Sequence, residues 1–298
     1  MNKNIKIGAI FPQTEIGVNP VDIREYALAA EYLEFDYILA FDHVLGADVS
    51  NRPNWAGPYT QQHSFYEPFV LFAHIAAFTS SIELATGIII LPQRQTALVA
   101  KQAATLDVLS NGRLRLGIGI GWNSVEYEAL GEDFSNRGIR SEEQIEVMRA
   151  LWTNETITYE GRWHKITDAG INPFPIQKPI PIWLGGKSEK VLERIGRIGD
   201  GWIAGGLDGP NQESQSIFNK VHQYTEKAGR KPEDVGLEAW LSAKQGPLDS
   251  LAEQVLEWQD IGATHIALTT MGAGYSNVTE HIQGLEYFKT AVEKNRHS

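Results

Sequence analysis

The sequence predicts a (β/α)8 barrel, and three observations lead to this fold. Short strand-like segments alternate with amphipathic helical segments along the whole chain. The strand-like segments are mostly apolar and β-branched, as in parallel strands that are covered on both faces. The length of 298 residues is common for one such barrel. A doubly wound open sheet is the alternative fold. We expect a single domain over residues 1–298, with insertions after the second and fourth strands.

The clearest strand–helix–strand unit runs from Ile82 to Trp122. Its first strand contains ELATGIII, and apolar residues recur at helical spacing from Leu98 to Leu109 in a helix that opens after Pro92. Asn111-Gly112 then supplies the left-handed residues that end a helix. In the second strand, LRLGIGIGW, glycine occupies alternate positions. One face of this strand therefore lies against either a neighbouring backbone or a flat ligand.

The other elements follow the same alternation. The first helix, from Pro20 to Glu34, has Asn19 as its expected cap. The other expected strands are short apolar runs at residues 5–12, 36–43, 181–186, 200–206, 235–240 and 264–270. The remaining helices are expected at residues 68–79, 125–130, 142–152, 188–198, 210–229, 247–261 and 278–294, with the loop FSNRGIR before the third of these.

Two segments interrupt the alternation. Residues 44–65 are polar, aromatic and proline-rich, which indicates a functional insertion over a pocket. Residues 156–180 contain ITYEGRWHKI, which predicts a hairpin turning at Glu160-Gly161, followed by proline-punctuated extended chain.

The composition excludes several classes of protein. The net charge is −11 and no basic cluster occurs, which argues against binding to nucleic acid or an anionic membrane. The chain has no cysteine, so disulfides, thiolate nucleophiles and zinc–thiolate sites are excluded. No apolar run approaches the roughly 20 residues that a membrane span needs, and the N-terminal segment reads as a strand instead of a signal peptide. We expect a soluble, cytoplasmic protein.

Chemically suited residues cluster at the ends of the predicted strands. In a barrel these ends meet at one mouth, where active sites lie. The strand-terminal residues are Asp42-His43, Thr86-Gly87, Gly121-Trp122-Asn123, Gly185-Gly186-Lys187-Ser188 and Thr269-Thr270.

His43 is the main titratable candidate. An imidazole at a strand end serves as a general acid or base, because its ordinary pKa lies near neutrality. The alternative is a structural histidine packed beneath the long loop. Adjacent strand residues point to opposite faces, so Asp42 and His43 do not form a joint metal site. The other histidines show no metal-binding spacing, and we expect no metal.

Gly185–Ser188 predicts an anion site where a strand meets a helix. Small residues let backbone N–H groups approach a phosphate, and Lys187 with the helix dipole adds positive potential. The alternative is a simple turn and cap. The GxG in GIGIGW lacks the full dinucleotide spacing. Carboxylates near strand ends, Glu126, Glu128 and Glu238, allow a glycosidase pair, although the first two also suit the start of a helix.

These motifs together resemble the luciferase-like monooxygenase superfamily, and more narrowly its coenzyme F-420-dependent oxidoreductases. The resemblance rests on Asp42-His43, the stretch from Leu84 to Trp122, Arg137-Gly138, and IWLGG followed by GDGW. It covers nearly the whole chain. It implies a barrel that binds F-420 or FMN, a small organic substrate and a homodimer, with a flavin or deazaflavin reductase as a further partner.

The resemblance also implies roles for individual residues. A non-prolyl cis peptide bond is expected at Gly87-Ile88, behind the coenzyme ring. Thr86, Gly87, Ile88, Gly121 and Trp122 would frame this ring together with Asp42 and Asn123. Gly185, Gly186, Lys187 and Ser188 would bind the phosphate end of the coenzyme, and His43 would act on the substrate.

The expected function is therefore that of an oxidoreductase. Hydride transfer with F-420 is the first hypothesis, and FMN-dependent monooxygenation with oxygen is the alternative. A flavin-binding barrel without turnover and a cofactor-free barrel hydrolase are hypotheses from other classes.

Overall fold

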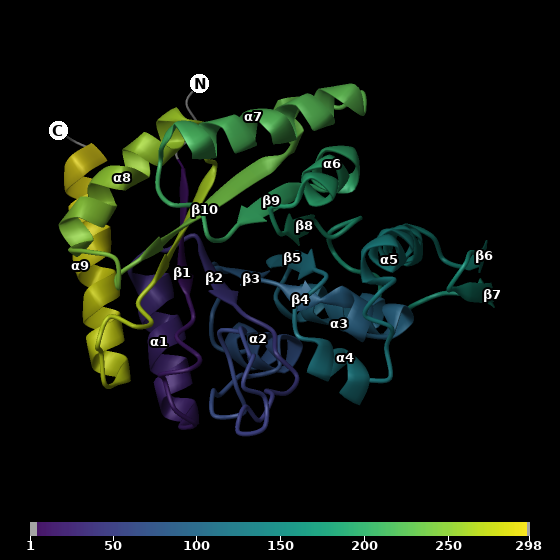
Figure 1. The fold of residues 1–298 in the computed structure, drawn as a ribbon, viewed down its shortest axis with the longest axis horizontal. Coiled ribbons are helices and arrows are strands. Elements are labelled where there is room, and N and C mark those ends of the chain that lie inside the picture. The colour runs from purple at the N-terminus through teal and green to yellow at the C-terminus, as the bar shows by residue number, and fades with distance from the viewer. Residues whose placement is uncertain (1–4, 297–298) are drawn as a thin grey trace.

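Parallel strands form a closed barrel in the computed structural model, which describes residues 5–296. The strands pair in the order β3-β2-β1-β11-β10-β9-β8-β5, and pairing of β3 with β5 closes the ring (Figure 1). The (β/α)8 prediction is confirmed. The barrel strands are β1 (Lys6–Ile10), β2 (Tyr37–Ala40), β3 (Glu83–Thr86), β5 (Leu114–Gly119), β8 (Ile182–Gly185), β9 (Gly201–Ala204), β10 (Gly236–Ser242) and β11 (His265–Thr269).

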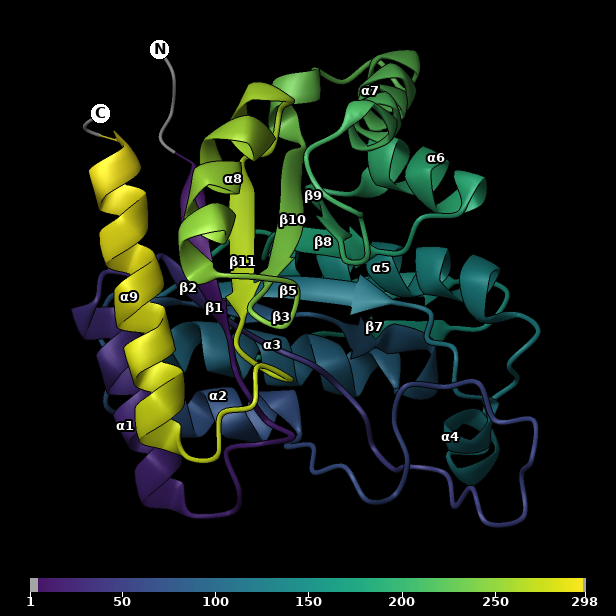
Figure 2. The same cartoon turned by 60° about the vertical axis from the view of Figure 1, so that its left-hand side comes forward.

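Helices surround this barrel, as two views show (Figures 1 and 2). Asn19 caps the first helix by accepting a hydrogen bond from the backbone N–H of Val21, as predicted. The helices are α1 (Pro20–Tyr32), α2 (Pro68–Ala76), α3 (Thr96–Leu109), α4 (Ser124–Ala129), α5 (Arg137–Thr153), α6 (Glu189–Ile198), α7 (Gln212–Lys227), α8 (Leu248–Asp260) and α9 (Val278–Arg296), with short 3-10 turns η1 (Leu91–Gln93) and η2 (Pro232–Asp234). Within residues 5–296, no helix is long and apolar enough to cross a membrane.

Two helix starts differ from the prediction by more than two residues. Helix α5 begins at Arg137, so the second half of FSNRGIR is helical and not loop. Pro92 lies in η1, and α3 begins only at Thr96. Both differences lie at element ends, where local sequence is least informative. The end of α3 matches the prediction, because Asn111 and Gly112 have φ values of 58° and 78°.

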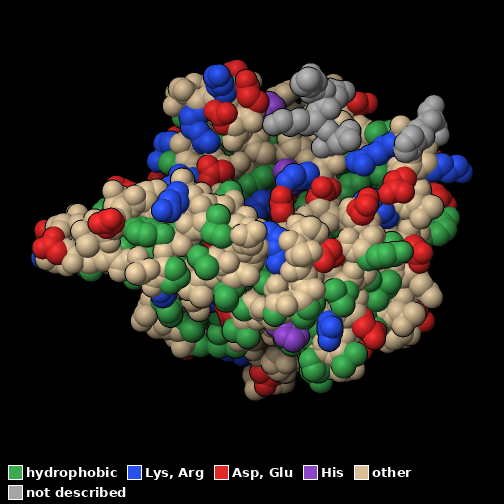
Figure 3. All heavy atoms as spheres, turned by 180° about the vertical axis from the view of Figure 1, so that it is seen from behind, with side chains coloured by type: hydrophobic (Ala, Val, Ile, Leu, Met, Phe, Trp, Pro, Cys, Tyr) green, Lys and Arg blue, Asp and Glu red, His purple; other side chains and the backbone are tan. Residues whose placement is uncertain are grey.

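The predicted hairpin is present as β6 (Ile157–Glu160) and β7 (Lys165–Ala169), which pair antiparallel. It projects from the barrel at the right of Figure 1 and at the left of Figure 3. The carboxylate of Glu143 on α5 holds its turn by accepting backbone hydrogen bonds from Arg162, Trp163 and His164. Residues 44–65 form an irregular loop that runs beside α4 (Figure 2).

The barrel interior contains an ion pair that the sequence did not reveal. Arg115 on β5 lies 2.7 Å from the carboxylate of Glu238 on β10, and both side chains are buried. The guanidinium also lies 4.3 Å from the ring centroids of both Tyr37 and Trp183. The two buried charges are therefore paired with each other, and the guanidinium also contacts two aromatic rings in the centre of the barrel.

The chain leaves β3 through a cis peptide bond between Gly87 and Ile88 and continues as β4 (Ile89–Ile90), which pairs with β5. The cis bond lies where the family resemblance predicts it. A Cβ on Gly117 would lie 1.9 Å from the carbonyl oxygen of Thr86, and one on Gly119 would lie 2.7 Å from Cδ1 of Ile88. These glycines therefore make room for the neighbouring chain. The flat-ligand explanation is wrong for these two positions.

Candidate active site

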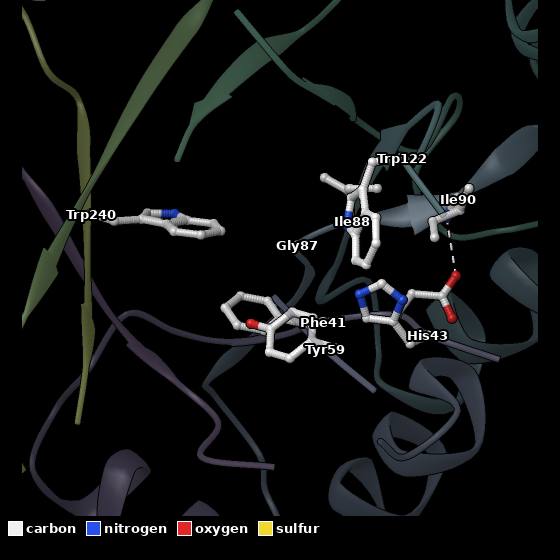
Figure 4. Close-up of a pocket in the computed structure, with 10 residues that line it drawn as sticks. Phe41, His43, Tyr59, Gly87, Ile88, Ile90, Trp122 and Trp240 are labelled. Carbon is white, nitrogen blue, oxygen red and sulfur yellow. Dashed lines mark hydrogen bonds between the residues drawn. The ribbon is translucent and has the colours of Figure 1, made fainter. Parts of the chain in front are cut away.

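A pocket opens at the carboxyl ends of the strands. It has a volume of about 190 Å³, and most of its lining is apolar or aromatic. Five parts of the chain contribute to it. They are the segment after β2, the loop 44–65, residues 87–90 (the β3–β4 bulge), the segment after β5, and β10. The lining residues are Phe41, Asp42, His43, Tyr59, Gly87, Ile88, Ile90, Gly121, Trp122 and Trp240 (Figure 4).

His43 is held by a buried carboxylate from another element. Its Nδ1 lies 3.0 Å from Oε1 of Glu126 on α4, and Glu126 is completely buried. The same carboxylate accepts hydrogen bonds from the backbone N–H groups of Val44 and Leu45 and from Nε2 of Gln93. In all of these contacts the carboxylate is the hydrogen-bond acceptor. His43 consequently donates through Nδ1 and keeps Nε2 for a ligand in the pocket.

Asp42 has a structural partner behind the pocket. Its carboxylate accepts hydrogen bonds from the backbone N–H of Ile90 at 3.0 Å and from Arg94 at 2.7 Å (dashed to Ile90 in Figure 4). Arg94 also binds Glu67 at 2.8 Å. Burial raises the pKa of Asp42, and the guanidinium of Arg94 opposes this shift. The network connects the end of β2 to β4 and so holds the β3–β4 bulge beneath the pocket.

Aromatic rings form the walls of the pocket. The ring of His43 lies 5.1 Å from that of Tyr59 and 5.6 Å from that of Trp122, both edge to face. Trp240 stacks on Phe41 at 5.4 Å, on the opposite side of the pocket in Figure 4. Burial raises the pKa of Tyr59, so its hydroxyl stays protonated at neutral pH. These aromatic rings favour a flat ligand in the pocket.

Residues 8–243 match the family model of the luciferase-like monooxygenases. The chain belongs to this family. An uncharacterized protein of Mycobacterium tuberculosis is 37% identical over 166 residues, which span 56% of this chain and 56% of that protein. The match thus spans about half the length of this relative. An F-420-dependent glucose-6-phosphate dehydrogenase of Segniliparus rotundus is 30% identical over 237 residues, covering 77% of this chain and 66% of that enzyme.

Solved structures share the fold over nearly the full chain. A coenzyme F-420-dependent tetrahydromethanopterin reductase from Methanopyrus kandleri gives a TM-score of 0.77 at 17% identity, covering 98% of this chain and 99% of that one. A long-chain alkane monooxygenase gives a TM-score of 0.80 at 14% identity, covering 99% and 92%. At these identities the comparison establishes the barrel architecture alone.

The pocket unites many, but not all, of the residues that the sequence predicted for it. Six line it, from Asp42 and His43 to the bulge and the segment after β5. Thr86 instead points into the barrel wall, where its hydroxyl donates to the carbonyl of Gly117 at 2.6 Å. Asn123 caps α4 by accepting a hydrogen bond from the backbone N–H of Val125. Both side chains are buried and lie behind the pocket, not in its lining.

The residues predicted to bind a phosphate do not line this pocket. Gly185 lines a small neighbouring cavity with Ser141 and the buried Arg194. Gly186 has φ 115°, and its carbonyl accepts a hydrogen bond from Nε1 of Trp202. Lys187 and Ser188 are exposed, and the Ser188 side chain does not cap α6.

The structure contradicts the glycosidase interpretation. Glu126 is bound to His43, Glu128 is exposed on α4, and Glu238 is buried in the barrel interior with Arg115. These carboxylates do not face one another across a pocket. The residues that line the site without having been predicted are Phe41, Tyr59, Ile90 and Trp240. The aromatic richness of residues 44–65 was a signal for Tyr59, and the position of Trp240 on a strand was one for that residue.

The side chains present fit a flavin-type ring. Ile88 projects from the bulge as an apolar support, and the aromatic walls match a planar heterocycle. The small cavity beside Gly185 is also lined by Ile118 and by Arg194, whose Nε donates to Glu142 at 2.8 Å. Among residues 5–296 no group of three metal-ligating side chains occurs.

Proposed function

We propose that this protein is an oxidoreductase that moves a hydride between coenzyme F-420 and an organic substrate, with His43 as the proton donor or acceptor. The observation that carries the proposal is the pairing of His43 with the buried Glu126, because it orients one imidazole nitrogen towards an apolar pocket. The 30% identical relative named as F-420-dependent supports this choice of coenzyme.

In this proposal the residues of the chain have separate roles. The bound coenzyme supplies or accepts the hydride. Ile88 and Gly87 would support its ring, while Trp122 and Tyr59 would exclude water from the opposite face. Gly185, Gly186, Lys187, Ser188 and Arg194 would bind its phosphate end. His43 would take the substrate proton on Nε2 during oxidation and return it during reduction, while Glu126 stabilises the imidazolium that forms.

FMN-dependent monooxygenation is the second candidate, and the match to the luciferase-like monooxygenase model favours it. The same pocket would hold the FMN ring, and His43 would serve proton transfers there. This alternative requires a separate reductase as a partner. The resemblance to the family further predicts a homodimer, which light scattering on the purified protein would test.

Titration of the purified protein with F-420 and, separately, with FMN tests the proposal. Trp122 and Trp240 line the pocket, so ring binding should quench tryptophan fluorescence. Tight binding of F-420 alone supports hydride transfer. Tight binding of FMN alone would support FMN-dependent monooxygenation instead. If neither coenzyme binds at tens of micromolar, the proposal is wrong.

A further inference from the structure

Three polar side chains meet beneath the hairpin, outside the pocket beside His43. The hydroxyl of Thr96, the first residue of α3, lies 2.5 Å from Nε2 of His164, which lies in the turn between β6 and β7. Nδ1 of His164 lies 2.8 Å from Oε1 of Glu143 on α5. Three separate elements thus place a hydroxyl, an imidazole and a carboxylate in the order of a nucleophile, its base and the group that orients the base.

The carboxylate of Glu143 sets the direction of these hydrogen bonds. Desolvation alone would raise its pKa, but hydrogen bonds from the backbone N–H of Trp163 and from the imidazole of His164 lower the pKa of Glu143 below its ordinary value. The ionised carboxylate accepts from Nδ1–H, so Nε2 of His164 accepts from the hydroxyl of Thr96. Nε2 of Gln144 donates to the same hydroxyl oxygen at 3.0 Å, so the hydroxyl proton is directed to His164.

A cavity of about 370 Å³ opens beside Thr96 and His164, and both residues line it. Val147, Trp163 and Ile166 add apolar surface to its lining. This volume admits a small organic molecule whose body packs against the apolar side chains. The cavity therefore gives the hydroxyl of Thr96 a space in which a substrate can bind.

The charges around this cavity are already matched. Each lysine or arginine of the described lining is paired with a carboxylate. The pairs are Arg94 with Asp42 and Glu67, Arg140 with Glu132, and Lys165 with Glu160. A charged ligand would have to compete with these pairs, so the lining favours an uncharged one.

Two kinds of donor are available for a negative oxygen in the cavity. Ala97 follows Thr96 and lines the cavity, and its N–H belongs to the first turn of α3, where N–H groups have no partner within the helix. The side chain of Gln95 does not cap this helix. Nε and Nη2 of Arg140 are buried and have no hydrogen-bond partner among residues 5–296. The N–H of the residue after a nucleophile is an oxyanion donor in hydrolases, and such donors stabilise the tetrahedral intermediate.

From this geometry we propose a second catalytic site, at which Thr96 hydrolyses a small uncharged carboxylic ester. His164 takes the hydroxyl proton while Oγ1 of Thr96 attacks the ester carbonyl and an Oγ1–C bond forms. The C–O bond to the alcohol breaks, and the alcohol leaves with the proton from His164. Water then attacks the acyl group and gives a proton to His164. The Oγ1–C bond breaks, the carboxylic acid leaves, and the proton returns to Thr96.

Hydrolysis of p-nitrophenyl acetate by the full-length protein tests this site. Thr96→Val keeps the shape of the side chain but has no hydroxyl, and we expect kcat/KM to fall by about 10²–10⁴-fold. We expect a fall in the same range for His164→Gln, whereas Thr96→Ser should retain most of the activity. Thr105→Val, on the same helix and outside the cavity lining, is the matched control. Circular dichroism shows whether each variant is folded.

A covalent label tests the nucleophile in the parent protein without any substitution. A fluorophosphonate probe transfers its phosphonyl group to an activated hydroxyl and releases fluoride, and peptide mass spectrometry locates the adduct. We expect the adduct on Thr96 in the parent protein and none on Thr96 in His164→Gln. If the three side chains only hold the hairpin on the barrel, Thr96 carries no adduct in either protein.

Three results would overturn the inference. They are no ester hydrolysis by the parent protein, no adduct on its Thr96, and equal rates for folded Thr96→Val and the parent. If Thr96→Val does not fold, the label on the parent protein decides. Neither measurement requires coenzyme, so their outcome is independent of the proposed function.

Discussion

Oε1 of Glu126 lies 3.0 Å from Nδ1 of His43, although the two residues are 83 positions apart in the chain. Glu126 arrives from the short helix that follows β5, and His43 from the end of β2. The carboxylate also binds the first two backbone N–H groups of the loop 44–65. One buried anion thus orients the imidazole and anchors the segment that encloses it.

Replacing this carboxylate should affect both stability and activity. In Glu126→Gln the side chain keeps its shape but loses the charge, and an amide nitrogen faces donors that it cannot accept from. We expect the free energy of unfolding to fall by about 2–4 kcal/mol, with a loss of turnover, as measured by urea denaturation and steady-state rates. Glu128→Gln, on the exposed face of the same helix, is the control. Equal stability of the two variants would contradict the role of Glu126.

Replacing His43 should separate chemistry from coenzyme binding. His43→Asn removes the titratable group while retaining a polar side chain. We expect the rate of hydride transfer to fall by about 10²–10⁴-fold, whereas the affinity for the coenzyme changes little. Stopped-flow absorbance measures the first quantity and fluorescence titration the second. The exposed His74→Asn on α2 should behave as the parent protein. Full activity of His43→Asn would remove the assigned role.

The glycines of β5 should not tolerate a methyl group. In Gly117→Ala the new Cβ would start 1.9 Å from the carbonyl oxygen of Thr86, a backbone atom that cannot move without the strand. We expect the free energy of unfolding to fall by about 1–3 kcal/mol. Gly246→Ala, which meets no atom within 4 Å, should lie within about 0.5 kcal/mol of the parent. Thermal unfolding compares the two, and a Gly117→Ala protein as stable as the parent would contradict the close approach of β5 to Thr86.

The ion pair in the barrel interior should be costly to break from one side. Arg115→Met leaves the buried carboxylate of Glu238 without its 2.7 Å partner. Such a change costs about 3–5 kcal/mol. The double variant Arg115→Met with Glu238→Leu should recover part of this loss, because no unpaired charge remains. Glu160→Gln, in an exposed pair with Lys165, should change stability by less than about 1 kcal/mol. Additive losses in the double variant would contradict this account.

His265 should make stability depend on pH. Burial lowers the pKa of His265 well below 6.5, and the nearby Arg115 and Lys6 lower it further. The unfolded chain therefore binds the proton more readily, so the stabilising contribution is complete above pH 6.5 and is lost as pH falls below it. His265→Phe keeps a ring beside Trp183 and cannot titrate. We expect a smaller fall in Tm between pH 7 and pH 5 in this variant.

The exposed His74→Phe serves as the control for that measurement. His222 and His281 also have lowered pKa values, so some dependence on pH should remain in His265→Phe. An unchanged dependence in His265→Phe would show that His265 titrates normally.

The sequence alone determined the barrel and the end of it that bears the site. Alternating short apolar strands and helices specify a parallel sheet, and the ends of parallel strands lie together by geometry. This geometry predicts that His43, Gly87 and Trp122 share one mouth, and all three line the pocket. The turn at Asn111 and the hairpin after Thr156 followed from local turn chemistry.

Which side chains meet depends on the tertiary structure. Glu126 had the same local signature as Glu128, because both suit the start of a helix, and the helix's rotation alone buries one and exposes the other. Thr86 is the last residue of β3, yet its hydroxyl donates to the carbonyl of Gly117 on β5. The contact between Arg115 and Glu238 joins residues 123 positions apart across the barrel. Local patterns fix the direction of a strand or helix, whereas these pairings depend on tilt and register set by the closed sheet.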